Sequence, residues 1–168
     1  MDAPTIRPAY SAWPDLNDRL IEALRGLTID QLAFTSGPDH WPLWAVAGHL
    51  ACQRVFWLCD FAGEPGAETT PFTDAAHLCP GDDDLDHPFD GPALAAALTS
   101  TFRIVEAFLD RWTLADLGET IRRPDYGPDW VKTRGNVIQR VHQHDIAHLH
   151  EIDDLLAAQG LPRMQLWP

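Results

Sequence analysis

The chain has 168 residues, of which 45% are hydrophobic and 22% are charged, and its formal net charge is −13. This length suffices for one well-cored domain and is short for two, so we expect a single domain over residues 1–168. The composition is typical of a globular protein. Such an excess of acidic residues argues against a phosphate-backbone partner and an anionic membrane surface, because both require a basic patch. We therefore expect neither a nucleic acid nor a membrane as partner.

The cysteines and the apolar segments indicate where the protein works. Three cysteines are an odd number and favour a reducing compartment. Cys52 and Cys59 lie two turns apart on one predicted helix, about 10 Å along its axis, which is too far for a disulfide. Cys79 falls in a predicted loop. No apolar run approaches the length that spans a bilayer, and the first residues do not resemble a signal peptide. We predict a cytoplasmic protein.

Two helices are predicted in the first part of the chain. The first covers residues 14–27, with Pro14 at a first helical position and leucines at helical spacing. The second covers residues 42–63 and is apolar on most of its circumference. Its main polar strip consists of His49, Gln53 and Asp60. The strip is either the solvent face of the helix or the wall of a polar pocket, and the residues alone favour solvent.

A long connection, residues 64–91, follows the second helix and is rich in Pro, Gly and Asp. A segment of this length in a small domain indicates a functional lid or a long crossover. It contains the acidic run Asp82, Asp83, Asp84 and Asp86. The run lacks the ligand spacing and the closing Glu of an EF-hand calcium loop, so we interpret it as a solvated surface segment.

The second half of the chain predicts two more helices. They cover residues 92–112 and 133–159, and a loop with room for a short hairpin separates them. Thr133 is suited to cap the last helix, and Gly160 ends it. Four helices with one long middle connection predict an all-α four-helix bundle with a long crossover between helices 2 and 3. Short links would place helices 1 and 2, and helices 3 and 4, side by side.

The last predicted helix carries four histidines in nine residues. On a helical wheel His144 and His148 fall within the apolar stripe one turn apart, His142 lies on its flank, and His150 points away. Buried imidazoles need partners, which are either a metal ion or hydrogen bonds to side chains and buried water. The spacing is known from zinc sites, although the Glu of the H-E-x-x-H motif is absent. Asp145 lies on the apolar side, where it either orients a ligand ring or is a partly solvated acid.

Two stretches resemble a known family. WPLWAVAGHLACQRVFWL resembles the second helix of the DinB/YfiT-like bundle proteins, and the H-x3-H pair of His144 and His148, followed by Gly160, resembles their last helix. The resemblance covers essentially the whole chain. It implies that His49 joins His144 and His148 in binding one divalent metal ion, zinc or nickel. His49 and Gln53 would then face a pocket instead of solvent.

The resemblance also carries expectations about function. Mycothiol-dependent maleylpyruvate isomerases and bacillithiol transferases are related to this family. It therefore implies a small-molecule substrate and a low-molecular-weight thiol as cosubstrate, in thiol transfer or thiol-dependent isomerisation. The alternatives are a metal-dependent hydrolase and a non-catalytic homodimeric stress-response or interaction protein with an idle metal site. The isomerases often have Glu where this chain has His144, and many members have a second adjacent His after the pair, so the substrate class stays open.

Overall fold

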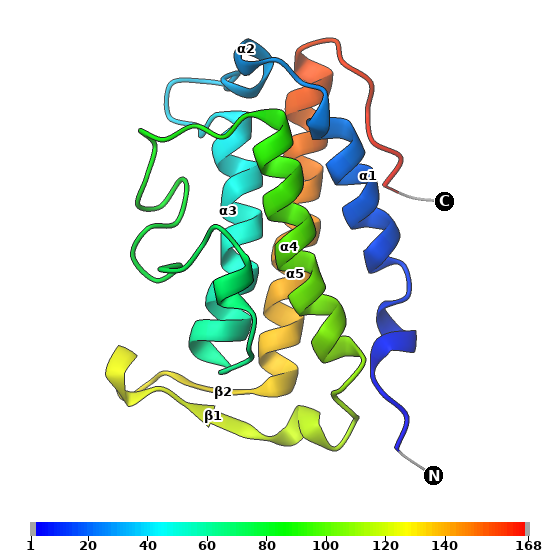
Figure 1. Ribbon diagram of the computed structural model, residues 1–168, viewed down its shortest axis with the longest axis vertical. Coiled ribbons are helices and arrows are strands. Elements are labelled where there is room, and N and C mark those ends of the chain that lie inside the picture. Colours follow the sequence, from blue (N-terminus) through cyan, green and yellow to red (C-terminus); the bar gives the residue numbers. More distant parts are fainter. Residues whose placement is uncertain (1–2, 167–168) are drawn as a thin grey trace.

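The computed structural model describes residues 3–166, which are mostly helical. The prediction of a largely α-helical chain is confirmed. Four long helices lie side by side, with a short helix and a two-stranded hairpin at opposite ends of the molecule (Figure 1). The helices are α1 (Trp13–Arg25), α2 (Ile29–Leu32), α3 (Leu43–Val55), α4 (Gly91–Leu109) and α5 (Arg134–Ala158), and the strands are β1 (Thr120–Arg122) and β2 (Val131–Thr133).

The helix ends follow local signals in the sequence. Thr133 caps α5 by accepting a hydrogen bond from the backbone N–H of Asn136, whose side chain bonds back to Thr133. Gly160, with a φ of 72°, follows the last turn of α5 in the left-handed conformation that favours glycine. Asp90 caps α4 by accepting a hydrogen bond from the backbone N–H of Ala93. The predicted α5 boundaries are therefore right to within one residue at each end.

Other boundaries differ from the prediction. The predicted helix 42–63 is α-helical only to Val55 and continues as a π-helical segment, Phe56–Phe61, named η2. Such widened turns are rare and are frequent near functional sites. α1 ends at Arg25 instead of residue 27, and α4 ends at Leu109 instead of residue 112. The short helix α2 was not predicted.

The pairs of helices that pack side by side differ from the predicted pairs. The closest backbone contacts join α3 to α4, α1 to α4, and α3 to α5. The pairs predicted from short links, α1 with α3 and α4 with α5, are therefore not among the closest, whereas α3 and α4, which the long connection joins, lie side by side. The links explain the difference, because residues 26–42 contain α2 and residues 110–133 contain the hairpin, and both are long enough to cross the end of the molecule (Figure 1).

One helix corrects the prediction about apolar runs. Among the described residues, α4 alone is long and apolar enough to cross a membrane by length and composition. More than half of its most apolar stretch is buried inside the molecule, as in the core helix of a soluble protein. Leu94, Leu98, Val105 and Phe108 of α4 are fully buried in one core shared with the other long helices. We therefore interpret α4 as a core helix.

The long connection before α4 packs along the outer side of α3 (Figure 1). Phe72, Ala75 and Cys79 anchor it by burying their side chains in the core. Its acidic run lies at the surface, where three of the four acids are exposed and Asp84 is half-buried. The connection therefore forms a wall beside α3 in addition to linking two helices.

Candidate metal centre

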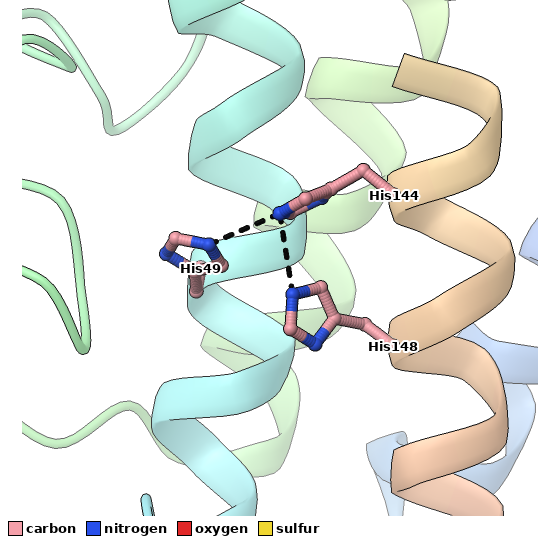
Figure 2. Close-up of side chains that lie close together, drawn as sticks. All are labelled: His49, His144 and His148. Atoms are coloured by element: carbon pink, nitrogen blue, oxygen red, sulfur yellow. Dashed lines mark hydrogen bonds between the residues drawn. The ribbon is translucent and has the colours of Figure 1, made fainter. Parts of the chain in front are cut away.

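Three histidines from two helices converge between α3 and α5. His49 comes from α3, and His144 and His148 come from successive turns of α5 (Figure 2). The Nε2 atom of His144 lies 3.1 Å from Nε2 of His49 and 3.2 Å from Nε2 of His148. One ligand atom of each ring lies within 4.8 Å of the other two, close enough for all three to hold one metal ion. The structure thus brings together His144 and His148, which the helical wheel selected, and His49, which the family resemblance added.

The ring of His49 is fixed from behind by the long connection. His49 is only 5% exposed, so its interpretation as a solvent-facing residue is wrong. Its Nδ1 lies 3.2 Å from the carbonyl oxygen of Pro80, to which it can donate. Gly48 permits this contact, because a Cβ at that position would lie 3.1 Å from the Cβ and Cγ atoms of Pro80. The Gly-His sequence therefore lets the connection approach α3 at the height of His49.

The ring of His148 is fixed by its own helix. Its Nδ1 lies 2.7 Å from Oε2 of Glu151, three residues further along α5. A ring that donates its Nδ1 proton to an oxygen keeps a free lone pair on Nε2. This applies to His148 and to His49, so both present Nε2 lone pairs toward His144. Lone pairs directed at one point fit a cation.

Burial keeps two of the three rings neutral. It lowers the pKa of His144 to about 3, and the neighbouring rings of His148 and His49 lower it further. Burial also lowers the pKa of His148, although the bond to Glu151 opposes this effect. For His49 burial acts in the same direction, but the contacts with Cys79 and Asp82 outweigh it and raise the pKa. His144 and His148 are therefore in the form that binds metals at neutral pH.

A second group of donor atoms lies on the other side of His49. Cys79 Sγ is 3.7 Å from Nδ1 of His49, and Oδ2 of Asp82 is 3.5 Å from the same nitrogen. Hydrogen bonding from Cys52, and then from His49 and Gln53, lowers the pKa of Cys79 to about 6 against the effect of burial. These groups place a negative environment behind His49. Nε2 of Gln53 lies 3.7 Å from Sγ of Cys79, so Gln53 lies beside this second group, whereas the family resemblance implied a position in the metal pocket.

Comparison with known proteins agrees with the resemblance. A family model described as the DinB superfamily matches residues 15–152. The chain belongs to the DinB superfamily. The crystal structure of a DinB-like protein from Bacillus cereus ATCC 10987 has a similar fold, with a TM-score of 0.70, 18% identity, and coverage of 99% of this chain and 100% of that chain. A search of curated proteins gives no match.

In this DinB chain Asp145 does not have either role predicted for it. It is fully buried, so it is not a partly solvated acid, and it bonds to no ring of the cluster. Instead its Oδ2 accepts hydrogen bonds from Nε1 of Trp13 at 2.8 Å and from Nε of Arg54 at 2.9 Å. Arg54 also donates to Asn17 of α1 at 2.9 Å. Asp145 therefore anchors α5 to α1 and α3 at the residue next to His144.

The remaining histidines of α5 lie where the wheel placed them. His142 is half-buried on the flank and packs edge-on against Trp13, with ring centroids 4.8 Å apart. His150 is exposed. Neither belongs to a group of potential metal ligands among residues 3–166. The helical period alone was therefore sufficient to separate the two candidate ligands from the two other histidines.

Sequence reasoning missed the residues that support the cluster. Pro80, Cys79 and Asp82 lie in the long connection, and the acidic run was interpreted only as a solvated segment. The signal for Glu151 was present, because it lies three residues after His148 on the same helix face. The prediction that Cys52 and Cys59 do not form a disulfide is confirmed, since all three cysteines are free.

Proposed function

We propose that His49, His144 and His148 bind one divalent metal ion, zinc or nickel, and that the protein is an enzyme that uses a low-molecular-weight thiol as cosubstrate. The observation that carries the proposal is the convergence of three Nε2 atoms, with separations of 3.1 and 3.2 Å along the cluster. Imidazole nitrogens suit both metals. Membership of the DinB superfamily supports it, and thiol chemistry comes from the family resemblance.

The proposed chemistry follows from the donor set. A divalent ion held by three neutral rings supplies Lewis acidity, which lowers the pKa of a thiol or water molecule beside it. Three protein ligands are typical of catalytic zinc sites, whereas structural sites have four. Pro80 and Glu151 hold the rings of His49 and His148 in position. The buried position of His49 limits the access of water from the side of the long connection.

Two alternatives use the same cluster. A metal-dependent hydrolase needs only water in place of the thiol, and a non-catalytic protein would bind the metal without turnover. We also propose the four-helix bundle topology of the family in a single domain, a cytoplasmic location, a small-molecule substrate, and a homodimer. The three free cysteines support the proposed location, because reducing compartments keep thiols unpaired.

Metal content and turnover together test the proposal. We expect elemental analysis of protein purified without a His tag, and reconstituted with zinc, nickel or manganese, to give about one divalent ion per chain. Metal content near zero would exclude the site. The loaded protein is then assayed with 1-chloro-2,4-dinitrobenzene and a thiol (cysteine, glutathione, mycothiol or bacillithiol), and with p-nitrophenyl acetate without thiol.

The pattern of activity distinguishes the three functions. Thiol-dependent turnover that is lost in His144→Ala supports thiol transfer. Ester hydrolysis without thiol, lost in the same variant, supports the hydrolase. A fully loaded protein that is inactive in both assays supports an idle metal site.

A further inference from the structure

A pocket of about 580 Å³ opens between η2, the β1–β2 hairpin and the first turns of α5. We call it the indole pocket, because Trp57 and Trp130 line it together with Lys132, Asn136 and Arg140. Its volume is within the range of small-molecule sites. None of the three histidines of the cluster lines it. Arg140 is the lining residue nearest to the cluster along α5. It lies one helical turn before His144, and the two positions are about 6 Å apart along the helix axis.

The pocket combines a flat apolar wall with positive charge. The rings of Trp57 and Trp130 stack, with centroids 6.0 Å apart and an interplanar angle of 25°. The guanidinium of Arg140 lies over the ring of Trp57, 5.7 Å from its centroid. Lys132 is the only lysine in the whole sequence. An aromatic wall with cations at its edge is suited to a flat molecule that carries an anionic group.

The two cations of this pocket have no acidic partner among the described residues, although the chain is rich in acidic residues. The protein has 25 acidic and 12 basic residues. Nevertheless, neither Lys132 nor Arg140 forms an ion pair within residues 3–166, whereas Arg7, Arg54, Arg123 and Arg163 all do. Asp129 also lines the pocket, and the two cations still leave an excess of one positive charge there. This charge lies close to the cluster, because Arg140 is one helical turn before His144 on α5.

Trp57 supplies an independent observation. The residue is only 8% exposed, and its indole N–H has no hydrogen-bond acceptor in the described part of the chain. Buried indoles usually have an acceptor. In this protein Trp13 donates to Asp145 and Trp112 donates to Glu64. Within residues 3–166, Trp57 therefore lines a pocket with two unpaired cations, and its own buried indole N–H lacks a partner.

We propose that the indole pocket binds the anionic, flat part of the substrate, namely an aromatic or conjugated carboxylate. The carboxylate bonds to Arg140 and Lys132, while the flat body lies against the rings of Trp57 and Trp130. This inference rests on the proposed function, because it places the reacting group of the same molecule at the histidine cluster. It also predicts the substrate's length, with the anionic group at least about 6 Å from the reacting atom.

The test uses 2-naphthoate as probe and metal-free protein, so that its carboxylate cannot bind a metal ion instead. Proton–nitrogen NMR spectra of the full chain resolve the indole N–H groups. We expect saturable shifts for Trp57 and Trp130, and none for Trp13 and Trp112, whose indoles bond to internal carboxylates. Equal shifts of the Trp13 and Trp112 indoles and of the pocket indoles, or no shift at millimolar probe, would refute the proposal.

Matched variants identify the contribution of charge. Arg140→Gln and Lys132→Gln should each weaken 2-naphthoate binding about tenfold, the usual effect of losing one charged hydrogen bond. Arg103→Gln, which removes an exposed cation from α4, should leave it unchanged. The neutral analogue 2-naphthamide should bind the parent about as weakly as the acid binds Arg140→Gln. Equal binding of acid and amide would overturn the proposal.

A second series separates this inference from the proposed function. His144→Ala and His148→Ala should lose metal but still bind 2-naphthoate, because neither residue lines the pocket. Loss of probe binding in these variants, with folding retained, would contradict a separate pocket. Absence of metal from the parent, with probe binding intact, would refute the metal site and leave the pocket.

Discussion

Arg54 and Asp145 form an ion pair in the centre of the molecule, with Nη2 of Arg54 2.7 Å from Oδ2 of Asp145 and each side chain 1% exposed. Arg54 belongs to α3, which carries His49, and Asp145 directly follows His144 on α5. The pair thus links the two helices that carry the histidine cluster. It fixes the rotation of α5 about its axis at the height of His144.

Breaking this pair from one side should strongly destabilise the fold. Asp145→Asn leaves the positive charge of Arg54 buried without a counter-ion. Arg54→Met leaves the negative charge of Asp145 buried without one. We expect each to lower the free energy of unfolding by about 3–5 kcal/mol. Urea denaturation measures it. The double variant Arg54→Met/Asp145→Leu should lose less than the sum of the two single variants, because no unpaired charge remains.

A surface ion pair provides the matched control. Asp154 is 75% exposed and pairs with Arg163, which is 58% exposed. Asp154→Asn should change the free energy of unfolding by less than about 1 kcal/mol. If Asp145→Asn were as mild as Asp154→Asn, the central pair would not determine stability.

The four histidines of α5 should differ in metal binding. His144→Ala and His148→Ala each remove one of the converging Nε2 atoms, so we expect either variant to lose most of the bound zinc in elemental analysis. The parent should bind about one ion per chain. His150→Ala should bind the same amount, because His150 is exposed and outside the cluster. Loss of zinc in His150→Ala, with retention in His144→Ala, would show that the cluster is not the metal site.

Metal should stabilise a bundle that is already folded without it. The core is built from large apolar side chains of all four long helices, so helicity should not depend on metal as it does in a zinc finger. Circular dichroism of chelator-treated protein at pH 7.5 should therefore show the parent's helicity. Zinc at a hundred times its dissociation constant should add about 2.7 kcal/mol, which corresponds to a melting temperature about 5–10 °C higher. An unfolded metal-free protein would contradict this prediction.

The stability of the metal-free protein should fall as the pH is lowered from about 6.5. In the unfolded chain His144 takes up a proton near that pH, whereas in the folded chain its pKa is lowered to about 3. Between these values the unfolded state binds more protons, so acid favours unfolding. The effect of this one residue should reach about 2 kcal/mol at pH 5.

The variant His144→Gln isolates this contribution. It removes the titrating ring, so its free energy of unfolding should depend less on pH between 6.5 and 5 than that of the parent. Urea denaturation of chelator-treated samples at several pH values gives both slopes. Identical slopes would show that His144 is not protected from protonation.

The close approach of Pro80 to α3 should matter for metal affinity. Gly48→Ala places a Cβ 3.1 Å from two side-chain atoms of Pro80, so residues 79–82 must move away from His49. Loss of such an outer hydrogen bond should weaken zinc binding about tenfold or more. A zinc competition assay measures this. Gly118→Ala is the matched control, because a Cβ there meets nothing within 4 Å, and equal affinities of the two variants would contradict the role of Gly48.

The sequence determined the parts of the site that depend on local geometry. A helix repeats every 3.6 residues, so His144 and His148 had to share a face, and His150 had to point elsewhere, wherever the helix packs. The same reasoning predicted the cap at Thr133 and the end of α5 at Gly160. The third histidine, His49, came from the family resemblance, because local patterns favoured a solvent position for it.

Only the tertiary structure decided which distant groups meet. Asp145 lay on the apolar side of the wheel, but its counter-ion Arg54 is 91 positions away, and no period connects them. Likewise Pro80 contacts His49 although 31 positions separate them. Trp130, just before β2, stacks on Trp57 of η2 although α4 and β1 lie between them in the sequence. Such contacts depend on how long links cross the ends of the molecule. That path is set by the packing of the whole core, because each helix settles where the combined burial of all apolar side chains is best.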